Sequence, residues 1–324
     1  MTAPAPDGRA RGWWATGAGL AGGLLLDGLV GDPRRGHPVA AFGRVAGAAE
    51  RLLYADARLP GAAYAAVLVG GATGLGVVAG RTPDRTAYRV LLTALATWSM
   101  VGGTTLRREA AVMSTLLQGS DLPAARRRLS HLCGRDAGGL EAGEIARAVV
   151  ESVAENTSDA HVGPLVWGAL FGVPGLLGYR AVNTLDAMVG HRSERYLRFG
   201  WASARADDVA NLLPARVSAV LATLCAPLVG GRATDATRAW RRDGGKHPSP
   251  NAGPVEAAFA GALGRRLGGA VVYAGRIEHR PSLGSGAPPE RADIARAARL
   301  SAAVSASAGV LAVAVRLALD GHRR

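Results

Sequence analysis

The chain has 324 residues, of which 48% are hydrophobic and only 5% aromatic, and it includes 45 glycines. Charged residues make up 19%, below the roughly 25% typical of soluble domains, and they form blocks separated by long uncharged intervals. The formal net charge is +13, but the arginines flank apolar runs instead of alternating with aromatic residues, as base-stacking platforms require. The pattern argues against nucleic-acid binding and favours a membrane protein with positively charged cytoplasmic loops.

Several common chemical signatures are absent from the sequence. Cys133 and Cys225 are far apart and lack a CxxC partner, so neither a disulfide framework nor a thiolate metal site is predicted. No GxxxxGK[ST], HExxH or GxSxG motif occurs. A nucleotide, if one is used, is therefore not held by a P-loop.

The first apolar run covers residues 13–31 and follows Arg9 and Arg11. No small-residue cleavage site precedes a recognisable mature start, so we expect a retained signal anchor. Its GAGLAG stretch, residues 17–22, matches GxGxxG. Because no strand precedes it, the glycines indicate helix packing and not a dinucleotide site.

A basic loop, GDPRRGHPVAAFGR, follows at residues 31–44. Pro33 and Pro38 keep Asp32 and His37 out of regular helix, because proline lacks an amide donor and disfavours helical geometry just before it. The loop is either a turn at the membrane edge or a contributor of Asp32 and His37 to a site.

Further uncharged runs are candidate membrane spans. Residues 61–80 are the clearest, with GxxxG spacing at Gly70/Gly74 and Gly76/Gly80 that would let helices approach closely. Residues 90–106 are a third candidate, with Arg89 able to snorkel at the edge. Two shorter runs cover residues 217–231 and 300–315.

The run from Val162 to Tyr179 has eighteen residues without charge, close to the ~20 needed to cross a bilayer. Pro164, Pro174 and five glycines weaken it as a straight helix. If it spanned, the polar segment 180–216 would lie on the outside, so we expect a buried or re-entrant hairpin that keeps both flanks on one side. The predicted fold is an all-α, polytopic membrane helical bundle with about four to six transmembrane or re-entrant helices.

We treat residues 1–324 as one membrane-embedded domain with amphipathic cytoplasmic helices. Arginine-rich segments at about 32–60, 107–161 and 232–299 are expected on the cytoplasmic side. In the second, Asp121 is a predicted N-cap with Pro123 in the first turn. In the third, residues 281–290 are rich in Gly, Pro and Ser and indicate a flexible loop.

Three acidic residues share one face of a predicted helix over residues 140–156. At 100° per residue, Glu144, Glu151 and Glu155 fall within about 60° of one another, so they repel and need a compensating charge. One alternative is Mg²⁺, bound through one or two carboxylates together with substrate phosphates. The other is a solvated face that pairs with Arg147 and neighbouring arginines.

Polar side chains continue on both sides of the 162–179 run. Residues 156–159, Asn-Thr-Ser-Asp, are expected to break the helix because short polar side chains compete for backbone hydrogen bonds. Spacings of three to four residues then recur in two places, as on one helix face. These are Tyr179, Arg180, Asn183 and Asp186, and then Arg205, Asp208 and Asn211.

A second candidate centre is KHPSPNAGPVEAAFAGALG, residues 246–264. Its prolines hold HPSPNAG extended, and Pro254 suits the first turn of a helix running to about Leu267. Free amides at that helix start, with polar side chains close by, suggest either a phosphate site or a structural turn. The side chains are Lys246, His247, Ser249 and Asn251.

Long motifs in this chain resemble the adenosylcobinamide-phosphate synthases of cobalamin biosynthesis. The resemblance runs in order over nearly the whole chain. It is carried by LLLDGLVGDPRRGHPVAAFGR (24–44), ENTSD (155–159), YRAVNTLDAMVGH (179–191), FGWASARADDVANLLPAR (199–216) and HPSPNAGPVEAAFAGALGRRLGG (247–269). Ala160, His161 and His191 depart from the family pattern.

The resemblance implies a multi-pass cell-membrane ligase that joins an aminopropanol, usually as its O-phosphate, to a propionate of adenosylcobyric acid, with ATP as co-substrate and Mg²⁺. Its active site would be cytoplasmic. Its partners would be these small molecules and the lipid bilayer, with either a homo-oligomer or a complex with late pathway enzymes. The alternative is a non-enzymatic regulator or carrier related to this family.

The resemblance and the residue chemistry together give a candidate site. Glu151, Glu155, Asp159 and Asp208 are the expected catalytic carboxylates, the first three of them around Mg²⁺. The remaining positions would hold phosphates or line the pocket. They are His37, Asn156, Arg180, Asn183, Asp186, Arg205, Lys246, His247, Ser249 and Asn251.

Overall fold

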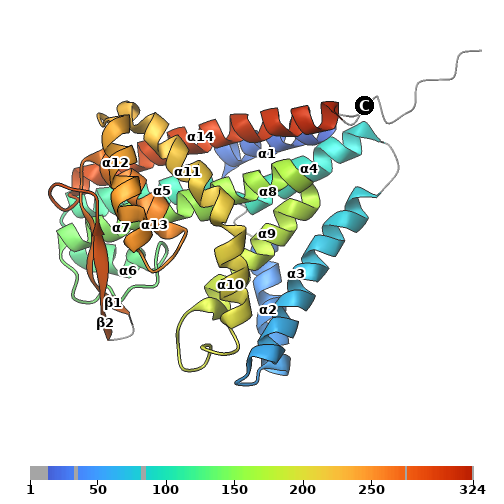
Figure 1. Cartoon of the computed structure of the whole chain (residues 1–324), viewed down its shortest axis with the longest axis horizontal. Coiled ribbons are helices and arrows are strands. Elements are labelled where there is room, and N and C mark those ends of the chain that lie inside the picture. Colours follow the sequence, from blue (N-terminus) through green and yellow to red (C-terminus); the bar gives the residue numbers. More distant parts are fainter. Residues whose placement is uncertain (1–13, 33–35, 82–84, 274–275, 323–324) are drawn as a thin grey trace, which may run out of the picture. The chain divides into compact units, whose positions relative to one another are not determined.

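The computed structural model describes residues 14–32, 36–81, 85–273 and 276–322. The described chain is mostly helical, as predicted (Figure 1). Its residues group into two compact units. Arg9, Arg11 and Pro33, which entered the sequence argument, lie outside the described residues.

The first unit comprises Met1–Gly102, Gly163–Ala210 and Gly309–Arg324. It contains the apolar helices of the amino-terminal third and the helices of residues 163–210, which follow the ENTSD motif. Its elements are α1 (Ala15–Val30), α2 (Pro38–Leu53), α3 (Arg58–Gly80), α4 (Thr86–Met100), α8 (Gly163–Phe171), α9 (Val173–Leu185), the π-helical turn η3 (Asp186–Gly190), α10 (Trp201–Ala210) and the end of α14 (Arg291–Gly321).

The second unit comprises Gly103–Val162 and Asn211–Ala308. It carries most of the polar segments, a β-hairpin and the first part of α14. Its elements are α5 (Gly103–Gln118), α6 (Leu122–Leu129), α7 (Ala142–Thr157), the π-helical turn η2 (Ser158–Val162), α11 (Leu212–Cys225), the 3₁₀ turns η4 (Ala226–Val229) and η5 (Gly244–Lys246), α12 (Ala233–Asp243), α13 (Ala252–Leu263), β1 (Leu267–Tyr273) and β2 (Arg276–Leu283).

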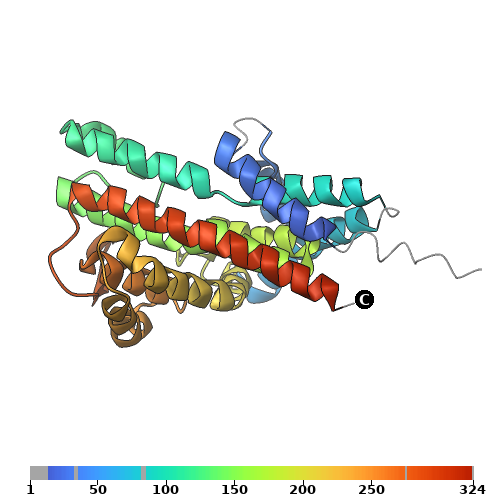
Figure 2. The same cartoon turned by 90° about the horizontal axis from the view of Figure 1, so that it is seen from above.

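Three helical segments of the described chain are long and apolar enough to cross a membrane: Arg58–Gly80, Leu212–Val229 and Arg291–Gly321. They confirm the runs predicted at 61–80, 217–231 and 300–315, and the last is one long, continuous helix (Figure 2). α1 is a shorter apolar helix. The span predicted at 90–106 is wrong, because α4 ends at Met100 and α5 begins at Gly103.

The glycines of α1 let it pack closely on α4. A Cβ on Gly19 would lie 2.9 Å from the Val90 carbonyl oxygen, and one on Gly23 would lie 2.6 Å from the Ala94 carbonyl oxygen. Gly19 lies in the GAGLAG stretch, so helix packing explains that motif, as predicted.

Replacing Gly23 by alanine is expected to destabilise the protein by about 1–3 kcal/mol, because the new methyl group would overlap α4. Gly28→Ala is the matched control on the same helix, since a Cβ there meets no described atom within 4 Å. That control should be neutral or slightly stabilising through the better helix propensity of alanine. Thermal unfolding in detergent would compare the two, and equal midpoints would contradict the packing argument.

We expected the GxxxG glycines of α3 to bring another helix close, but most of them contact no other helix of the described chain. Among the described atoms, nothing lies within 4 Å of a Cβ placed on Gly70, Gly74 or Gly80. Gly76 alone of the four is in close contact, with the backbone of Pro174 at the start of α9. The motif spacing therefore does not form a continuous helix-packing stripe within the first unit.

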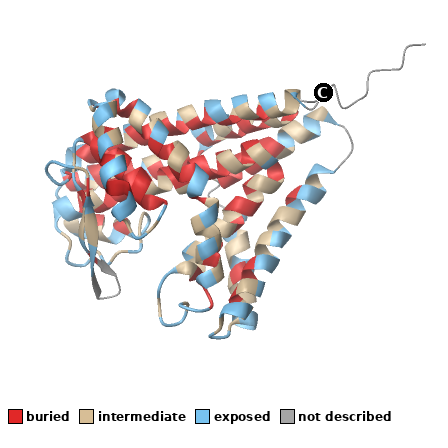
Figure 3. Cartoon of the chain, in the orientation of Figure 1, coloured by how far each residue is buried: buried red, intermediate tan, exposed pale blue. Residues whose placement is uncertain are grey.

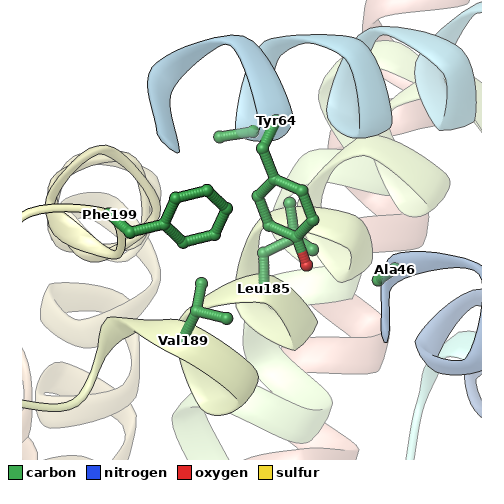
Figure 4. Close-up of a cluster of buried hydrophobic side chains, with 6 residues drawn as sticks. Ala46, Tyr64, Leu185, Val189 and Phe199 are labelled. Atoms are coloured by element: carbon green, nitrogen blue, oxygen red, sulfur yellow. The ribbon is translucent and has the colours of Figure 1, made fainter. Parts of the chain in front are cut away.

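An aromatic core in the first unit joins α3 to the end of α9 and the segment before α10. Tyr64 and Phe199 are fully buried with ring centroids 5.1 Å apart, and Leu185 and Val189 pack against them (Figure 4). Such tilted ring pairs add about 0.5–1.5 kcal/mol beyond area burial. This core holds η3, and with it the polar residues of the YRAVNTLDAMVGH motif.

The 162–179 run forms two short helices, α8 and α9, separated at Gly172, whose φ is 66°. Leu176 packs against Gly168, and Gly175 lies against the backbone of Trp167. The two helices therefore double back on each other as a hairpin, and neither is long enough to be a span.

Two helix boundaries in the second unit follow local sequence signals. Asp121 caps α6 as predicted, with its Oδ1 accepting a hydrogen bond from the Ala124 amide at 3.0 Å. α13 is buried along its whole length (Figure 3) but ends at Leu263, before Gly264 in the left-handed region at φ 66°, and not at about Leu267.

The β-hairpin that follows α13 was not predicted. β1 pairs antiparallel with β2, with Ala270 opposite His279 and Val271 opposite Glu278. β2 extends to Leu283, so the first residues of the segment 281–290 are strand and only the remainder is loop.

Candidate active site in the second unit

A buried ion pair forms the centre of the polar cluster on α7. Glu151 is 1% exposed and pairs through Oε2 with Arg135, from the segment between α6 and α7. Its other oxygen, Oε1, accepts a hydrogen bond of 2.7 Å from the Gly268 amide of β1. Both oxygens of Glu151 are therefore used by the protein, which fixes this carboxylate and ties β1 to α7.

The charge that compensates the acidic face of α7 is thus an arginine, but not Arg147. Arg147 donates instead to the carbonyl oxygens of Gly268 and Ala270, the latter at 2.8 Å, and so holds β1. Glu144 is exposed and forms a capping box at the start of α7, its Oε2 accepting from the Glu141 amide at 2.9 Å. Glu144 therefore does not join Glu151.

Glu155, one helical turn after Glu151, lies in the same electrostatic environment. Burial raises the pKa of the Glu155 carboxyl, and the negative charge of Glu151 raises it further, while Arg280 and Arg135 oppose the shift. The negative charge of Glu151 and the positive charges of Arg135 and Arg280 therefore act in opposite directions on the pKa of Glu155.

Glu256 on α13 is a member of this cluster that our sequence reasoning missed. It is 1% exposed, and its Oε1 has no hydrogen-bond partner. Burial raises the pKa of its carboxyl well above the ordinary value, with contributions from Glu151 and Glu155. The signal was present in the sequence as a single charge within AGPVEAAFAGAL, an otherwise apolar helix.

The Asn-Thr-Ser-Asp segment does not break the helix, contrary to our expectation. α7 runs to Thr157 and continues into η2, a π-helical turn, and such turns are frequent at functional sites. Asn156 donates to the Ser152 carbonyl oxygen at 3.0 Å, and Asp159 lies half-buried on η2.

His161, one of the departures from the family pattern, is a buried residue of η2. Its ring packs against Gly103 so closely that a Cβ there would overlap it. Burial lowers the pKa of His161 to about 4, and Arg107 lowers it further. A neutral, packed imidazole at this position indicates a structural role.

The HPSPNAG loop is held by hydrogen bonds of its own. Ser249 Oγ accepts from the amides of Asn251 and Ala252 at 3.3 and 3.1 Å, so two amides that we expected to be free for a phosphate are occupied. Asn251 Oδ1 accepts from Arg216 at 3.0 Å. Burial lowers the pKa of His247 to about 4, and Arg280 also lowers it.

Lys246 precedes this loop and donates to Asp243 at 2.8 Å. Asp243, at the end of α12, also accepts from Arg242 at 2.7 Å and from the Gly284 amide at 2.9 Å. The side chain of Lys246 is 53% exposed, so it can meet a ligand while it is held in place.

A cavity of about 460 Å³ opens beside the loop. Arg216 and Arg241 provide positive charge, Trp240 provides an aromatic face, and His247 contributes an imidazole. The volume is within the range of small-molecule sites, about 300–1,000 Å³. The remaining lining residues are Gly244, Gly245, Pro248, Pro250 and Pro254.

The other predicted residues form a polar group of their own in the first unit. Asn183 donates to Asp207 at 3.4 Å, and Arg180 donates to Asn183 at 3.3 Å. Burial lowers the pKa of His37, with Asp32 raising it and Arg180 lowering it. Arg205 pairs with Asp208 at 3.2 Å, and the Asp186 carboxylate fills the space beside Gly190.

No group of three or more His, Cys, Asp or Glu side chains among the described residues is placed to hold a metal ion. Glu151, Glu155 and Asp159 thus do not make a complete cage. Mg²⁺ commonly uses only one or two carboxylates together with substrate phosphates and water. Glu155, beside the fixed Glu151, is suited to be one such carboxylate.

Comparison with known proteins gives the family. Residues 20–301 match the family model described as CobD/Cbib protein. The chain is 54% identical over 301 residues to a cobalamin biosynthesis protein CobD of Mycobacterium tuberculosis, covering 93% of this chain and 96% of the relative. It is 45% identical to that of Geobacter metallireducens, covering 84% and 88%, and 42% identical to that of Chromobacterium violaceum, covering 90% and 96%. No solved structure matches significantly. The chain belongs to the CobD/CbiB family of cobalamin biosynthesis proteins.

Proposed function

We propose that this protein is an adenosylcobinamide-phosphate synthase. It would form an amide bond between the remaining propionate of adenosylcobyric acid and an aminopropanol, as its O-phosphate or as the free alcohol, at the expense of ATP. The observation that carries the proposal is the cluster of Glu151, Glu155 and Glu256 with Arg135 and Arg280, in which Glu151 and Glu256 are fully buried and Glu155 and Arg280 are half-buried. A purely structural helix bundle has no need to bury charges such as these, because each must be compensated.

The chemistry requires activation of the acid. A carboxylate and an amine do not condense in neutral water, so the natural intermediate is an acyl phosphate made from ATP. Transfer of the phosphoryl group depends on positioning and on neutralising charge more than on a protein nucleophile.

The second unit has residues suited to positioning a phosphoryl group and neutralising its charge. The cavity with Arg216, Arg241 and Trp240 suits a phosphate-bearing substrate with a planar group, since guanidinium groups bind phosphates and an aromatic face stacks on a ring. Lys246 would add a further positive charge. Bound Mg²⁺ would neutralise phosphate charge, with Glu155 as its carboxylate ligand.

The first unit would contribute through a separate polar group. Arg180 and Arg205 are the residues there that could bind phosphate, and Asp208 is held by Arg205. The proposed location is the cell membrane, with a cytoplasmic active site. A homo-oligomer or an assembly with other late enzymes of the pathway is part of this proposal.

Complementation tests the proposal. A bacterial strain that lacks this synthase grows only with added cobinamide, and the wild-type gene should allow it to grow when cobinamide is withheld. Glu155→Gln and Asp208→Asn are each expected to reduce ATP-dependent product formation in isolated membranes by about 10²-fold or more. Glu278→Gln is the matched control, because Glu278 is an exposed residue of β2.

A regulator or carrier would behave differently. Wild-type protein that reaches the membrane but fails to restore growth would favour that alternative class. Near-normal product formation by both Glu155→Gln and Asp208→Asn would contradict the roles proposed for these carboxylates. It would not contradict the proposed synthase activity.

A further inference from the structure

The cavity beside the HPSPNAG loop is lined by positive charge that no lining carboxylate balances. Its nine lining residues, all within the described part of the second unit, include the guanidinium groups of Arg216 and Arg241 and no Asp or Glu. The other arginines of α12, Arg238 and Arg242, each pair with a carboxylate of the same helix. The charge of Arg241 is therefore left for a ligand, and the cavity is suited to an anion.

Trp240 gives the same cavity a flat aromatic wall. It directly precedes Arg241 on α12, so the ring and the positive charge come from neighbouring positions of one helix. One edge of the indole is packed, because a Cβ on Gly244 would lie 3.0 Å from Trp240 Cδ1 and 3.2 Å from Pro254 Cα. The ring is half-buried, so its plane is held while it still lines the cavity. A planar group of a ligand can stack on such a ring.

Arg216 reaches the cavity from α11 and is held there by the loop. Its Nη1 donates to the Pro250 carbonyl oxygen at 2.9 Å and to Asn251 Oδ1 at 3.0 Å. A guanidinium group has five N–H donors, and these bonds use one nitrogen, so the other nitrogens remain for an anion. The loop is also fixed internally by Ser249, which accepts from two backbone amides. The cavity is therefore formed before a ligand arrives, which lowers the cost of ordering it on binding.

The cavity lies at one end of a candidate membrane span. Arg216 is near the start of the span Leu212–Val229, and the other lining residues follow the span in the chain. They belong to the arginine-rich segment 232–299, which the distribution of positive charge predicts on the cytoplasmic side. A ligand from the cytoplasm would therefore reach the cavity without crossing the bilayer.

Of the three reactants of the proposed synthase, ATP fits these features best. Aminopropanol phosphate is an anion, but it has no ring that could stack on Trp240. Adenosylcobyric acid carries no phosphate, and its corrin macrocycle is much broader than an indole ring. ATP combines a planar base with a chain of phosphates, and the sequence has no P-loop to hold those phosphates. Arginine side chains can bind them instead.

We propose that this cavity is the ATP site, in which the adenine stacks on Trp240 and the phosphates bind Arg241 and Arg216. The inference deepens the proposed synthase function and rests on it. Stacking accepts any base, because every base has a π face, and the lining side chains include no amide or carboxylate that could read a base edge. GTP should therefore compete with ATP for the site, with an affinity within about tenfold of that of ATP.

Equilibrium dialysis of the full-length protein in detergent tests the two halves of the site separately, with radiolabelled ATP and radiolabelled inorganic tripolyphosphate as ligands. Trp240→Ala should weaken ATP binding about 5- to 100-fold, whereas Trp240→Phe keeps a ring and should retain most of the affinity. Tripolyphosphate has no base, so Trp240→Ala should bind it as wild type does. Arg241→Gln should weaken the binding of both ligands about tenfold or more.

Gly245 allows the charge of the cavity to be changed without displacing its neighbours. It lines the cavity, and a Cβ there would meet no described atom within 4 Å. Gly245→Glu and Gly245→Gln add side chains of equal size, so the difference between them reports charge alone. The Glu variant should bind ATP and tripolyphosphate at least about fivefold more weakly than the Gln variant. Arg238→Gln, at an exposed ion pair of α12 outside the cavity lining, should match wild type.

Two results would overturn the inference. Loss of tripolyphosphate binding by Trp240→Ala would give the ring a structural role, and unchanged ATP affinity in both Trp240→Ala and Arg241→Gln would place the nucleotide elsewhere. Neither result would contradict the synthase function if wild-type protein still formed the amide. Conversely, the expected losses of ATP affinity together with no amide product from wild-type protein would refute the synthase function and support the nucleotide site.

Discussion

Replacing Arg135 by methionine is expected to lower the free energy of unfolding of the second unit by about 3–5 kcal/mol and to abolish activity. The side chains of Arg135 and Glu151 are 6% and 2% exposed. Without the guanidinium group, Glu151 would keep the Gly268 amide but would be left as an uncompensated buried charge. Thermal unfolding of the detergent-purified protein would measure the loss.

The double variant Arg135→Met/Glu151→Gln distinguishes a missing charge from a missing side chain. Removing both charges should recover most of the lost stability, because no buried charge is then unpaired, but it should not restore activity. Arg128→Met is the control, since its pair with Glu109 at 2.8 Å is partly exposed and should contribute less than about 1 kcal/mol. A double variant as unstable as Arg135→Met would contradict this explanation.

Asp243→Asn should have the second-largest effect on stability, about 2 kcal/mol. The carboxylate is 2% exposed and joins the end of α12 to Lys246 and to the Gly284 amide. Hydrogen bonds to a charged group contribute about 1.5–3 kcal/mol, and we reduce the sum because Arg242 and Lys246 are half exposed and regain water. Asp235→Asn, at an exposed pair with Arg238, should change little.

The stabilising effect of Asp243 also depends on pH. Arg242, Lys246 and the Gly284 amide hold the pKa of the Asp243 carboxyl well below its ordinary 3.8, against the opposing effect of burial. Because the pKa is depressed in the folded state, the contribution is fully present above the ordinary value and is lost as pH falls through the folded value. The difference in unfolding midpoint between wild type and Asp243→Asn should therefore be constant near neutrality and shrink below about pH 4; a constant difference down to pH 2 would contradict it.

Local signals predicted much of the helical framework. The charge-free run at 61–80 and the N-cap at Asp121 are short-range features, and both appear in the structure. The failed span at 90–106 shows the limit, because hydropathy does not reveal the break at Val101–Gly102. The β-hairpin was missed because local sequence does not reveal its contacts with α7, where Arg147 donates to the carbonyl oxygens of Gly268 and Ala270.

The candidate site was predictable in its residue types but not in its pairings. Glu151 and Glu155 follow from helical periodicity, since both lie on one face of α7. Their counter-charge, Arg135, lies in an irregular segment, so no periodic pattern marks it. Glu256 was overlooked because an isolated acid among alanines has no spacing to match, and only the fold brings it to α7.

The π-helical turns η2 and η3 change how sequences of this kind should be compared. A π turn closes over one residue more than an α turn, so everything after it is rotated by about 100° relative to a continuous α-helix. The carboxylates of α7 and the apolar residues after Val162 therefore belong to different helical phases. A single-residue gap or insertion near 158–162 or 186–190 in a relative would shift that phase, and should be weighed as a change in side-chain direction and not as a neutral length difference.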